Sequence, residues 1–397
     1  MLLVPVEKLE PAMKLARPVL HPGREDLLLL RAGLELRAEM IAQLIHERIR
    51  HVWIEAPGFE EVEQHVDEQI ARCHMDLYRV LNESIQRFKH RVALQLDIPA
   101  YREAIRKLLM RIIEHPAHEV VTQTATVGLP PLPSHLANCS YLSLLLGAHL
   151  LGYLREQRMM LPTNLIESTT QLGLGSLLHD IGKVRMPGDL QKTCVYEKDA
   201  ETDTYQRHAT MGYDMVRTQI SPIAANIVLH HHQRYDGRGF PGSPRPDLRA
   251  GRPCSDTKIH IFSRIVAVVN TFDHLLENRG VPTPTIVALH QLQSPRFAGW
   301  FDPVVVDALL RMVPPFTAGS TVRVSSGEEA VVLENHPEAP CKPTIKFIRR
   351  DEPPTSLGAA RLIDLRLSPN LKIVEVDGVD VSPYLYSGVF EPLAAAG

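Results

Sequence analysis

The amino-acid sequence predicts a mainly α-helical protein with a small α/β module at its N-terminus and a small β-rich domain at its C-terminus. The chain has 397 residues, which exceeds the usual size of one domain. Its middle part consists of apolar segments with helical periodicity. After Pro314 and Pro315 the pattern changes to alternating apolar and polar residues, which is typical of β-strands. We therefore expect four regions, at residues 1–58, 59–124, 125–315 and 316–397.

The first region, residues 1–58, alternates short β-like runs with one helical segment, ELRAEMIAQLIHERI. Turns are expected at Pro18, at His21 to Gly23 and at Gly33, where proline and glycine interrupt the apolar runs. The region contains no residues with an obvious catalytic role. It is expected to form a small α/β module.

The second region, from Phe59 to about His118, is almost continuously helix-forming. It is interrupted near Pro99, because the residue before a proline is disfavoured in the helical conformation. Residues 59–92 are expected to form one long amphipathic helix. Such a helix can signal to the next domain or form a homodimer with a second copy, and it is equally typical of a packing helix in a core. Both interpretations remain open.

The third region begins with a segment rich in glycine and proline, followed by a strongly apolar helix with His135 in its first turn. The central region is therefore expected to be all-α. In the last region, segments that start at Ser320 and Arg361 show period-two alternation and indicate a small β-rich domain. Further helices are expected at residues 165–183, 207–218, 223–231, 258–276 and 302–312.

Composition argues against several classes of function. The net charge of −3 and the lack of a basic stripe argue against a DNA or RNA polymer as a partner. Five scattered cysteines without a CxxC pair fit a reducing compartment and argue against a zinc ribbon. The longest apolar run, Tyr141 to Leu154, is too short for a membrane span, and MLLVPVEKLEP does not resemble a signal peptide. We expect a cytoplasmic enzyme or regulator.

Histidine is unusually frequent, with 19 residues, and several of them lie between Leu172 and Pro241. The Asp180 carboxylate has two oxygens and can bridge two metal ions, of which the adjacent His179 can bind one. Two such ions stabilise both the attacking and the leaving oxygen of a phosphodiester. A single His-Asp pair is weak support, but the histidines at 230–232 lead into DGRG, where glycines let the backbone approach a ligand. The pattern predicts a buried metal centre that includes His179, Asp180, His208, His231, His232 and Asp236.

Three motifs together, HDIGK, RHATMG and HHQRYDGRGFP, resemble the HD-GYP family, which comprises bacterial phosphodiesterases of the HD superfamily that act on cyclic di-GMP. The resemblance covers about residues 125–315, and the last motif is long enough to be specific. The N-terminal segment KLEPAMKLARPV is similar to a module often found before such domains.

The resemblance implies a role for each matching residue. Asp180 and Lys183 are the implied catalytic residues, with Asp180 bridging the ions and the Lys183 ammonium directed at the substrate phosphate. The implied metal ligands are His135, His179, Asp180, His208, His231, His232 and, at the position of the last aspartate ligand of the superfamily, Asn270. The implied substrate-binding residues are Lys183, Asp236, Gly237, Arg238, Gly239, Phe240, Pro241 and Arg279.

The sequence departs from the family at four positions. Phe240 replaces the tyrosine of the last motif, and Gln233 replaces the glutamate after the paired histidines. Asn270 replaces an aspartate ligand, and Asp273 lies three residues further along the same predicted helix. Pro131 stands where some members have a glutamate that binds a third metal. We therefore expect two metal ions rather than three.

The resemblance thus implies a metal-dependent phosphodiesterase that hydrolyses cyclic di-GMP to linear pGpG, and it leaves open further hydrolysis to GMP. Two divalent transition-metal ions are expected as cofactors, with iron or manganese favoured and zinc, nickel and cobalt also compatible with the ligands. One alternative is a catalytically impaired sensor or scaffold that binds cyclic di-GMP or signalling proteins. Another is a phosphohydrolase of a different nucleotide. The expected partner in each enzymatic case is a nucleotide, with a cyclic dinucleotide favoured.

Overall fold

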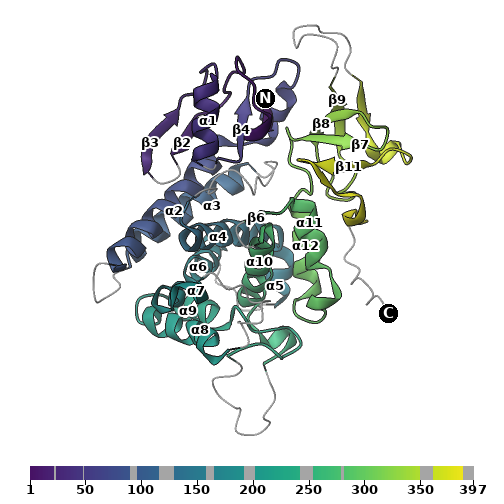
Figure 1. Cartoon of the computed structure of the whole chain (residues 1–397). Helices are drawn as coiled ribbons and strands as arrows, with labels where there is room; N and C mark the ends of the chain where they lie inside the picture. Colours follow the sequence, from purple (N-terminus) through teal and green to yellow (C-terminus); the bar gives the residue numbers. More distant parts are fainter. Residues whose placement is uncertain are drawn as a thin grey trace.

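The structure is a computed structural model, and Figure 1 shows its course. Helices make up most of the described part of the chain, which confirms the expected mainly α-helical fold with small sheets near both ends. No helix in this part of the chain is long and apolar enough to cross a membrane. The described residues are 1–21, 24–47, 49–89, 96–115, 129–157, 165–191, 202–241, 254–278, 281–348 and 361–387.

The N-terminal module combines two antiparallel strand pairs with one helix. Strand β1 pairs with β4, and β2 pairs with β3. Side chains of this module, among them Leu15, Leu36 and Leu44, form a small core of their own. The elements are β1 (Leu2–Pro5), β2 (Val19–His21), β3 (Arg24–Leu30), α1 (Ala38–His46) and β4 (His51–Ile54).

The expected long helix of residues 59–92 is shorter in the structure. A 3-10 helix, η2 (Glu60–His65), precedes α2 (Glu68–Lys89), and residues 90–95 lie outside the described part. Helix α3 (Ile98–Glu114) begins at the expected interruption, where the Asp97 carboxylate accepts a hydrogen bond of 3.1 Å from the backbone N–H of Ala100. Helix α2 contributes buried side chains to the main helical core and is therefore a packing helix of that core.

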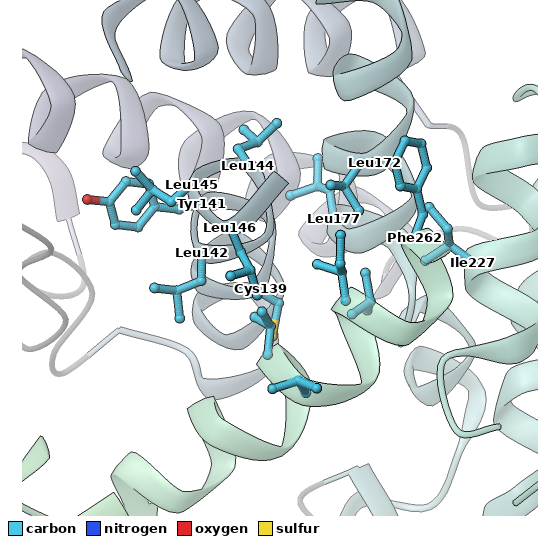
Figure 2. Close-up of a cluster of buried hydrophobic side chains, with 14 of the residues drawn as sticks. Cys139, Tyr141, Leu142, Leu144, Leu145, Leu146, Leu172, Leu177, Ile227 and Phe262 are labelled. Carbon is cyan, nitrogen blue, oxygen red and sulfur yellow. The ribbon is translucent and has the colours of Figure 1, made fainter. Parts of the chain in front are cut away.

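Helix α4 (Pro131–His149) lies at the centre of the helical region and is buried along most of its length. It contacts α2, α3, α6, α10 and α12. Figure 2 shows how Leu144 and Leu146 of α4 lie among apolar side chains from other helices, such as Leu177 and Phe262. The other helices here are α5 (Leu151–Gln157), α6 (Leu165–Leu178), η3 (Ile181–Arg185), α7 (Gly188–Gln191), α8 (Asp203–Val216), α9 (Pro222–His230), η5 (Asp256–Lys258), α10 (Ile261–Leu276), α11 (Thr285–Leu292), η6 (Pro295–Phe297) and α12 (Pro303–Met312).

The C-terminal domain is a six-stranded antiparallel sheet in the order β10-β9-β8-β7-β11-β12. Strand β7 pairs with β8 in a register that places Thr321 opposite Val331. The inner face of the sheet packs on its own cluster of side chains, which includes Val322 and Ile345. The strands are β7 (Thr321–Val324), β8 (Glu329–Glu334), β9 (Thr344–Phe347), β10 (Leu362–Asp364), β11 (Ile373–Val376) and β12 (Val379–Asp380).

The two end modules lie side by side at one end of the molecule (Figure 1). The backbone N–H of Leu3 donates a 2.9 Å hydrogen bond to the carbonyl of Gly319. Leu3 and Trp53 from the N-terminal module also share an apolar cluster with Val331 and Leu333 of β8. The sequence did not predict this contact, because nothing in local periodicity relates segments at opposite ends of a chain.

Candidate metal centre

The centre is built around Asp180, which follows the last residue of α6 and precedes η3. The predicted helix of residues 165–183 ends at Leu178, so that His179 and Asp180 lie in the turn between two helices. The side chains of both residues are completely buried. The turn between these two helices thus carries two of the three polar side chains of the motif HDIGK, and Lys183 is the third.

The two carboxylate oxygens of Asp180 face different groups of nitrogen atoms. Oδ1 lies 3.1 Å from Nε2 of His208 and 3.4 Å from Nε2 of His231. Oδ2 lies 3.5 Å from Nε2 of His179 and 3.7 Å from Nε2 of His135. We call these two groups the Oδ1 side and the Oδ2 side. This arrangement is the one expected of a carboxylate that bridges two metal ions.

His232 belongs to the Oδ1 side. One donor atom from each of Asp180, His208, His231 and His232 lies within 4.8 Å of all the others. The ring of His232 also packs against Phe240, with 4.6 Å between ring centroids. The Oδ1 side therefore offers three imidazoles and one carboxylate oxygen.

Three of the histidines are held in a common orientation by the backbone. Nδ1 of His179 lies 2.7 Å from the carbonyl of Ser176, and Nδ1 of His231 lies 2.8 Å from that of Val228. His208 makes the same contact with the residue three positions before it, at 2.5 Å. A carbonyl can only accept, so Nδ1 carries the hydrogen and Nε2 keeps its lone pair towards Asp180. This is the tautomer that a metal ligand needs.

The electrostatics of the centre agree with this assignment. Burial lowers the pKa of His208 and holds the pKa values of His179 and His232 well below their usual range, so these rings are neutral at pH 7. Burial opposes ionisation of Asp180, but the Lys183 ammonium, 2.7 Å from its carboxylate, outweighs burial and holds the Asp180 pKa well below its usual range. The centre thus combines one carboxylate anion with several neutral imidazoles.

Unsatisfied polar atoms provide a test of whether a metal fits here. Nε2 of His232 and both polar atoms of the Asn270 side chain are buried without a hydrogen-bond partner among the described residues. Leaving such a group unsatisfied costs about 1–3 kcal/mol. A bound metal ion would satisfy a free imidazole nitrogen, and nitrogen and oxygen donors suit iron, manganese and zinc. The residues present therefore fit a metal centre.

The Oδ2 side receives residues from two further helices. His135 of α4 has Nε2 at 3.3 Å from Nε2 of His179, while its Nδ1 lies 2.6 Å from Oδ2 of Asp273 on α10. His135 is in the second turn of α4 rather than the first, because the helix begins at Pro131. His274 of α10 also approaches this side, and the sequence reasoning missed it. His274 could have been identified from its spacing of four residues from Asn270, which places both residues on one face of the helix.

Two glycines of the motifs allow the backbones in the centre to approach each other. A Cβ atom on Gly182 would lie 2.0 Å from the carbonyl oxygen of His208, so only glycine lets η3 pack directly on α8. A Cβ atom on Gly239 would lie 2.2 Å from the carbonyl oxygen of His232. These contacts bring His208 and the loop after His232 to the Asp180 turn.

The predicted substrate-side residues form a loop beside the Oδ1 side. Asp236 forms an ion pair with the Arg234 guanidinium and accepts a 2.9 Å hydrogen bond from the backbone N–H of Arg238. Gly237 has a positive φ of 81°. The Arg238 side chain is exposed. Gly239, Phe240 and Pro241 continue the same loop, and Arg279 lies outside the described residues.

Lys183 lies inside the cluster and is almost completely buried. Its Nζ is 2.7 Å from Oδ2 of Asp180 and 5.3 Å from the ring centroid of Tyr205. The lysine that the sequence predicts to be catalytic therefore lies next to the Asp180 carboxylate.

Comparisons with known proteins agree with this architecture. Residues 156–305 match the family described as HD domain. The chain is 29% identical over 192 residues to the cyclic di-GMP phosphodiesterase PA4108 of Pseudomonas aeruginosa, which covers 48% of this chain and 43% of that protein. It is 31% identical over 169 residues to the cyclic di-GMP phosphodiesterase response regulator RpfG of Xanthomonas campestris, with 41% of each protein covered. The chain thus spans less than half the length of these curated relatives.

Among solved structures, the chain is similar to Bd1817, described as a HDG"Y"P protein from Bdellovibrio bacteriovorus. The two are 18% identical with a TM-score of 0.46, and the match covers 77% of this chain and 97% of that one.

Proposed function

We propose that the HD domain of this chain belongs to the HD-GYP family and is a metal-dependent phosphodiesterase that hydrolyses cyclic di-GMP to linear pGpG. The observation that carries the proposal is the carboxylate of Asp180, whose two oxygens each face their own group of histidine Nε2 atoms. The names of the relatives support the choice of substrate.

In this proposal the Oδ1 side would hold one ion through His208, His231 and His232, and the Oδ2 side would hold the second through His135 and His179. The Asp180 carboxylate would offer one oxygen to each side. When bound, the two ions supply an activated water at neutral pH and stabilise the oxygens of the phosphodiester.

The remaining residues of the site bind and orient the substrate. The Lys183 ammonium is almost fully buried, so its charge acts in a medium of low dielectric constant and is well suited to stabilise the phosphate during displacement. The loop from Asp236 to Pro241 places the Phe240 ring beside His232. This ring provides an apolar surface next to the metal centre on which a base can pack.

A specific observation keeps the sensor or scaffold alternative in view. Asn270 is neutral where the superfamily has an aspartate ligand. Among the described residues that could hold a metal ion here, Asp180 is the only one with a carboxylate. A centre with fewer anionic ligands binds metal less tightly. A protein of this kind can retain nucleotide binding while it loses turnover.

The decisive experiment combines metal analysis with hydrolysis of a nucleotide panel. The full chain, reconstituted with Mn²⁺ or Fe²⁺, is incubated with cyclic di-GMP, 3′3′-cGAMP, cyclic mononucleotides and linear dinucleotides. We expect two ions per chain and pGpG as the first product from cyclic di-GMP. Binding of cyclic di-GMP without turnover at full metal content would favour the sensor, and faster hydrolysis of another nucleotide would replace the proposed substrate.

His230→Gln is the matched control for variants of this site. The His230 ring lies in the same histidine run, but its Nδ1 is 2.8 Å from Oδ1 of Asn226. It lines a separate pocket together with residues such as Cys254 and Lys258. The metal content and turnover of the His230→Gln variant should match those of the wild type.

A further inference from the structure

The Oδ2 side of the proposed dinuclear centre, as assigned so far, has two histidines, whereas the Oδ1 side has three. We propose that His274 of α10 is the missing ligand and that it binds the metal ion of the Oδ2 side in place of the carboxylate that Asn270 lacks. This inference rests on the proposed metal centre and adds a ligand that the family motifs do not contain.

The position of His274 is the first argument. One donor atom from each of His135, Asp180 and His274 lies within 4.8 Å of the other two. The rings of His135 and His274 are stacked, with 4.2 Å between centroids and 21° between planes. Two imidazoles that bind one ion side by side can adopt such an arrangement.

The second argument is the face of α10 that points to the centre. Asn270 and His274 are separated by four residues within α10, so their side chains lie on the same face of the helix, one turn apart. A ligand at position 274 therefore reaches the centre from the same face as a ligand at position 270, displaced by one turn along the helix. The Asn270 side chain stands at the position of the missing aspartate ligand, where it is buried without a hydrogen-bond partner among the described residues.

The third argument comes from the orientation of His135. Its Nδ1 is 2.6 Å from Oδ2 of Asp273, which leaves Nε2 directed towards His179 and Asp180. A metal-bound histidine commonly donates its other N–H to a carboxylate in this way. Asp273 is therefore a positioning residue that acts through His135, and the ligand from α10 is its neighbour His274.

With His274 included, the two sides of Asp180 become equivalent in their donors. The Oδ1 side offers the imidazoles of His208, His231 and His232, and the Oδ2 side offers those of His135 and His179 together with His274, whose donor atom lies within 4.8 Å of those of His135 and Asp180. Neutral histidines suit divalent iron, manganese and zinc without requiring a further carboxylate.

The test separates coordination from packing by a variant that keeps an aromatic ring. In His274→Phe the ring that stacks on His135 is retained and the donor nitrogen is removed. In the double variant Asn270→Asp/His274→Phe a carboxylate is supplied one turn earlier on the same face. Both are compared with the wild type and with His230→Gln, as full chains, by titration with Mn²⁺ followed through the electron paramagnetic resonance signal of the free ion.

We expect two bound Mn²⁺ per chain in the wild type and in His230→Gln. In His274→Phe the second ion should bind at least about 100-fold more weakly, because the loss of a direct ligand costs more than the loss of a group that only orients one, and in the double variant its affinity should recover. The metal-free forms should have the same circular dichroism spectra. If His274→Phe is poorly folded, His274→Leu replaces it in both the single and the double variant.

Equal binding of both ions by wild type and His274→Phe would overturn the inference, and so would a loss of the second ion that Asn270→Asp does not restore. These outcomes differ from a failure of the proposed function. A wild-type chain that binds no Mn²⁺ would refute the metal centre itself, whereas two bound ions without hydrolysis of cyclic di-GMP would refute only the proposed activity.

Discussion

On the Oδ1 side of Asp180, His208 and His231 are each oriented by a backbone carbonyl three residues earlier in the chain. On the Oδ2 side, His179 has the same kind of contact, but His135 is oriented by the carboxylate of Asp273, which belongs to a different helix. The first kind of contact is local and follows from helix geometry. The second requires that α4 and α10 pack in one relative position, so this side depends on the tertiary structure.

The largest effect is expected where the two sides meet, at Asp180. Asp180→Asn should abolish binding of both ions and all hydrolysis, because each side loses its anionic oxygen at once. Metal content per chain after reconstitution with Mn²⁺ measures the result. Retention of one ion at wild-type affinity would show that the two sides are independent and that Asp180 does not bridge them.

This variant needs a control for folding, because it leaves the buried Lys183 ammonium without its partner at 2.7 Å. Breaking a buried ion pair in this way costs about 3–5 kcal/mol. Asp180→Asn/Lys183→Met removes both charges and should restore much of the stability to chemical denaturation. It should remain without metal.

His74 is a buried histidine outside both sides and tests what burial alone does. It lies on α2 and stacks on Tyr141 with 4.9 Å between ring centroids. Burial lowers its pKa from the ordinary 6.5 to about 4, an effect that Asp273 partly opposes. Below pH 6.5 the unfolded chain takes up a proton that the folded chain excludes, so His74 destabilises the fold progressively as the pH falls to about 4.

The lowered pKa of His74 reduces the free energy of unfolding by about 3 kcal/mol at the acid end of this range. In metal-free protein, His74→Phe should lose less stability than the wild type between pH 7 and pH 4.5, as measured by urea unfolding. The exposed His46, whose side chain is 86% accessible, gives the control variant His46→Phe. Identical pH profiles for wild type and His74→Phe would mean that the pKa of His74 is the same in the folded and unfolded chain.

The contrast between the two sides also explains how much the sequence could predict. The motifs identified His179, His208 and His231, because the contacts that orient these rings lie within three residues. The positions of Asp273 and His274 depend on how α10 is rotated against α4, which no local pattern specifies. For the same reason the mainly helical fold was predictable, while the shared core of Leu3 and Val331 was not.

Asp273→Asn should affect the Oδ2 side alone. The variant replaces the carboxylate at 2.6 Å from His135 with a neutral amide of the same shape, so the imidazole keeps only an uncharged acceptor and becomes a weaker ligand. We expect a 10- to 100-fold lower affinity for one of the two ions. Equal weakening of both ions in the Mn²⁺ titration would contradict the division into two sides.

The smallest effect is expected from Asn270→Asp in the wild-type background. An additional carboxylate brings a negative charge to the Oδ2 side and should raise the affinity for its ion. If His274 already binds that ion, the new carboxylate only supplements a complete set of donors, and the gain should stay below about tenfold, or about 1.4 kcal/mol. Retention of Mn²⁺ during dialysis against a weak chelator measures this gain in affinity.

A gain of several hundredfold would show that the ion lacked a ligand, and His274 would then be a packing partner of His135.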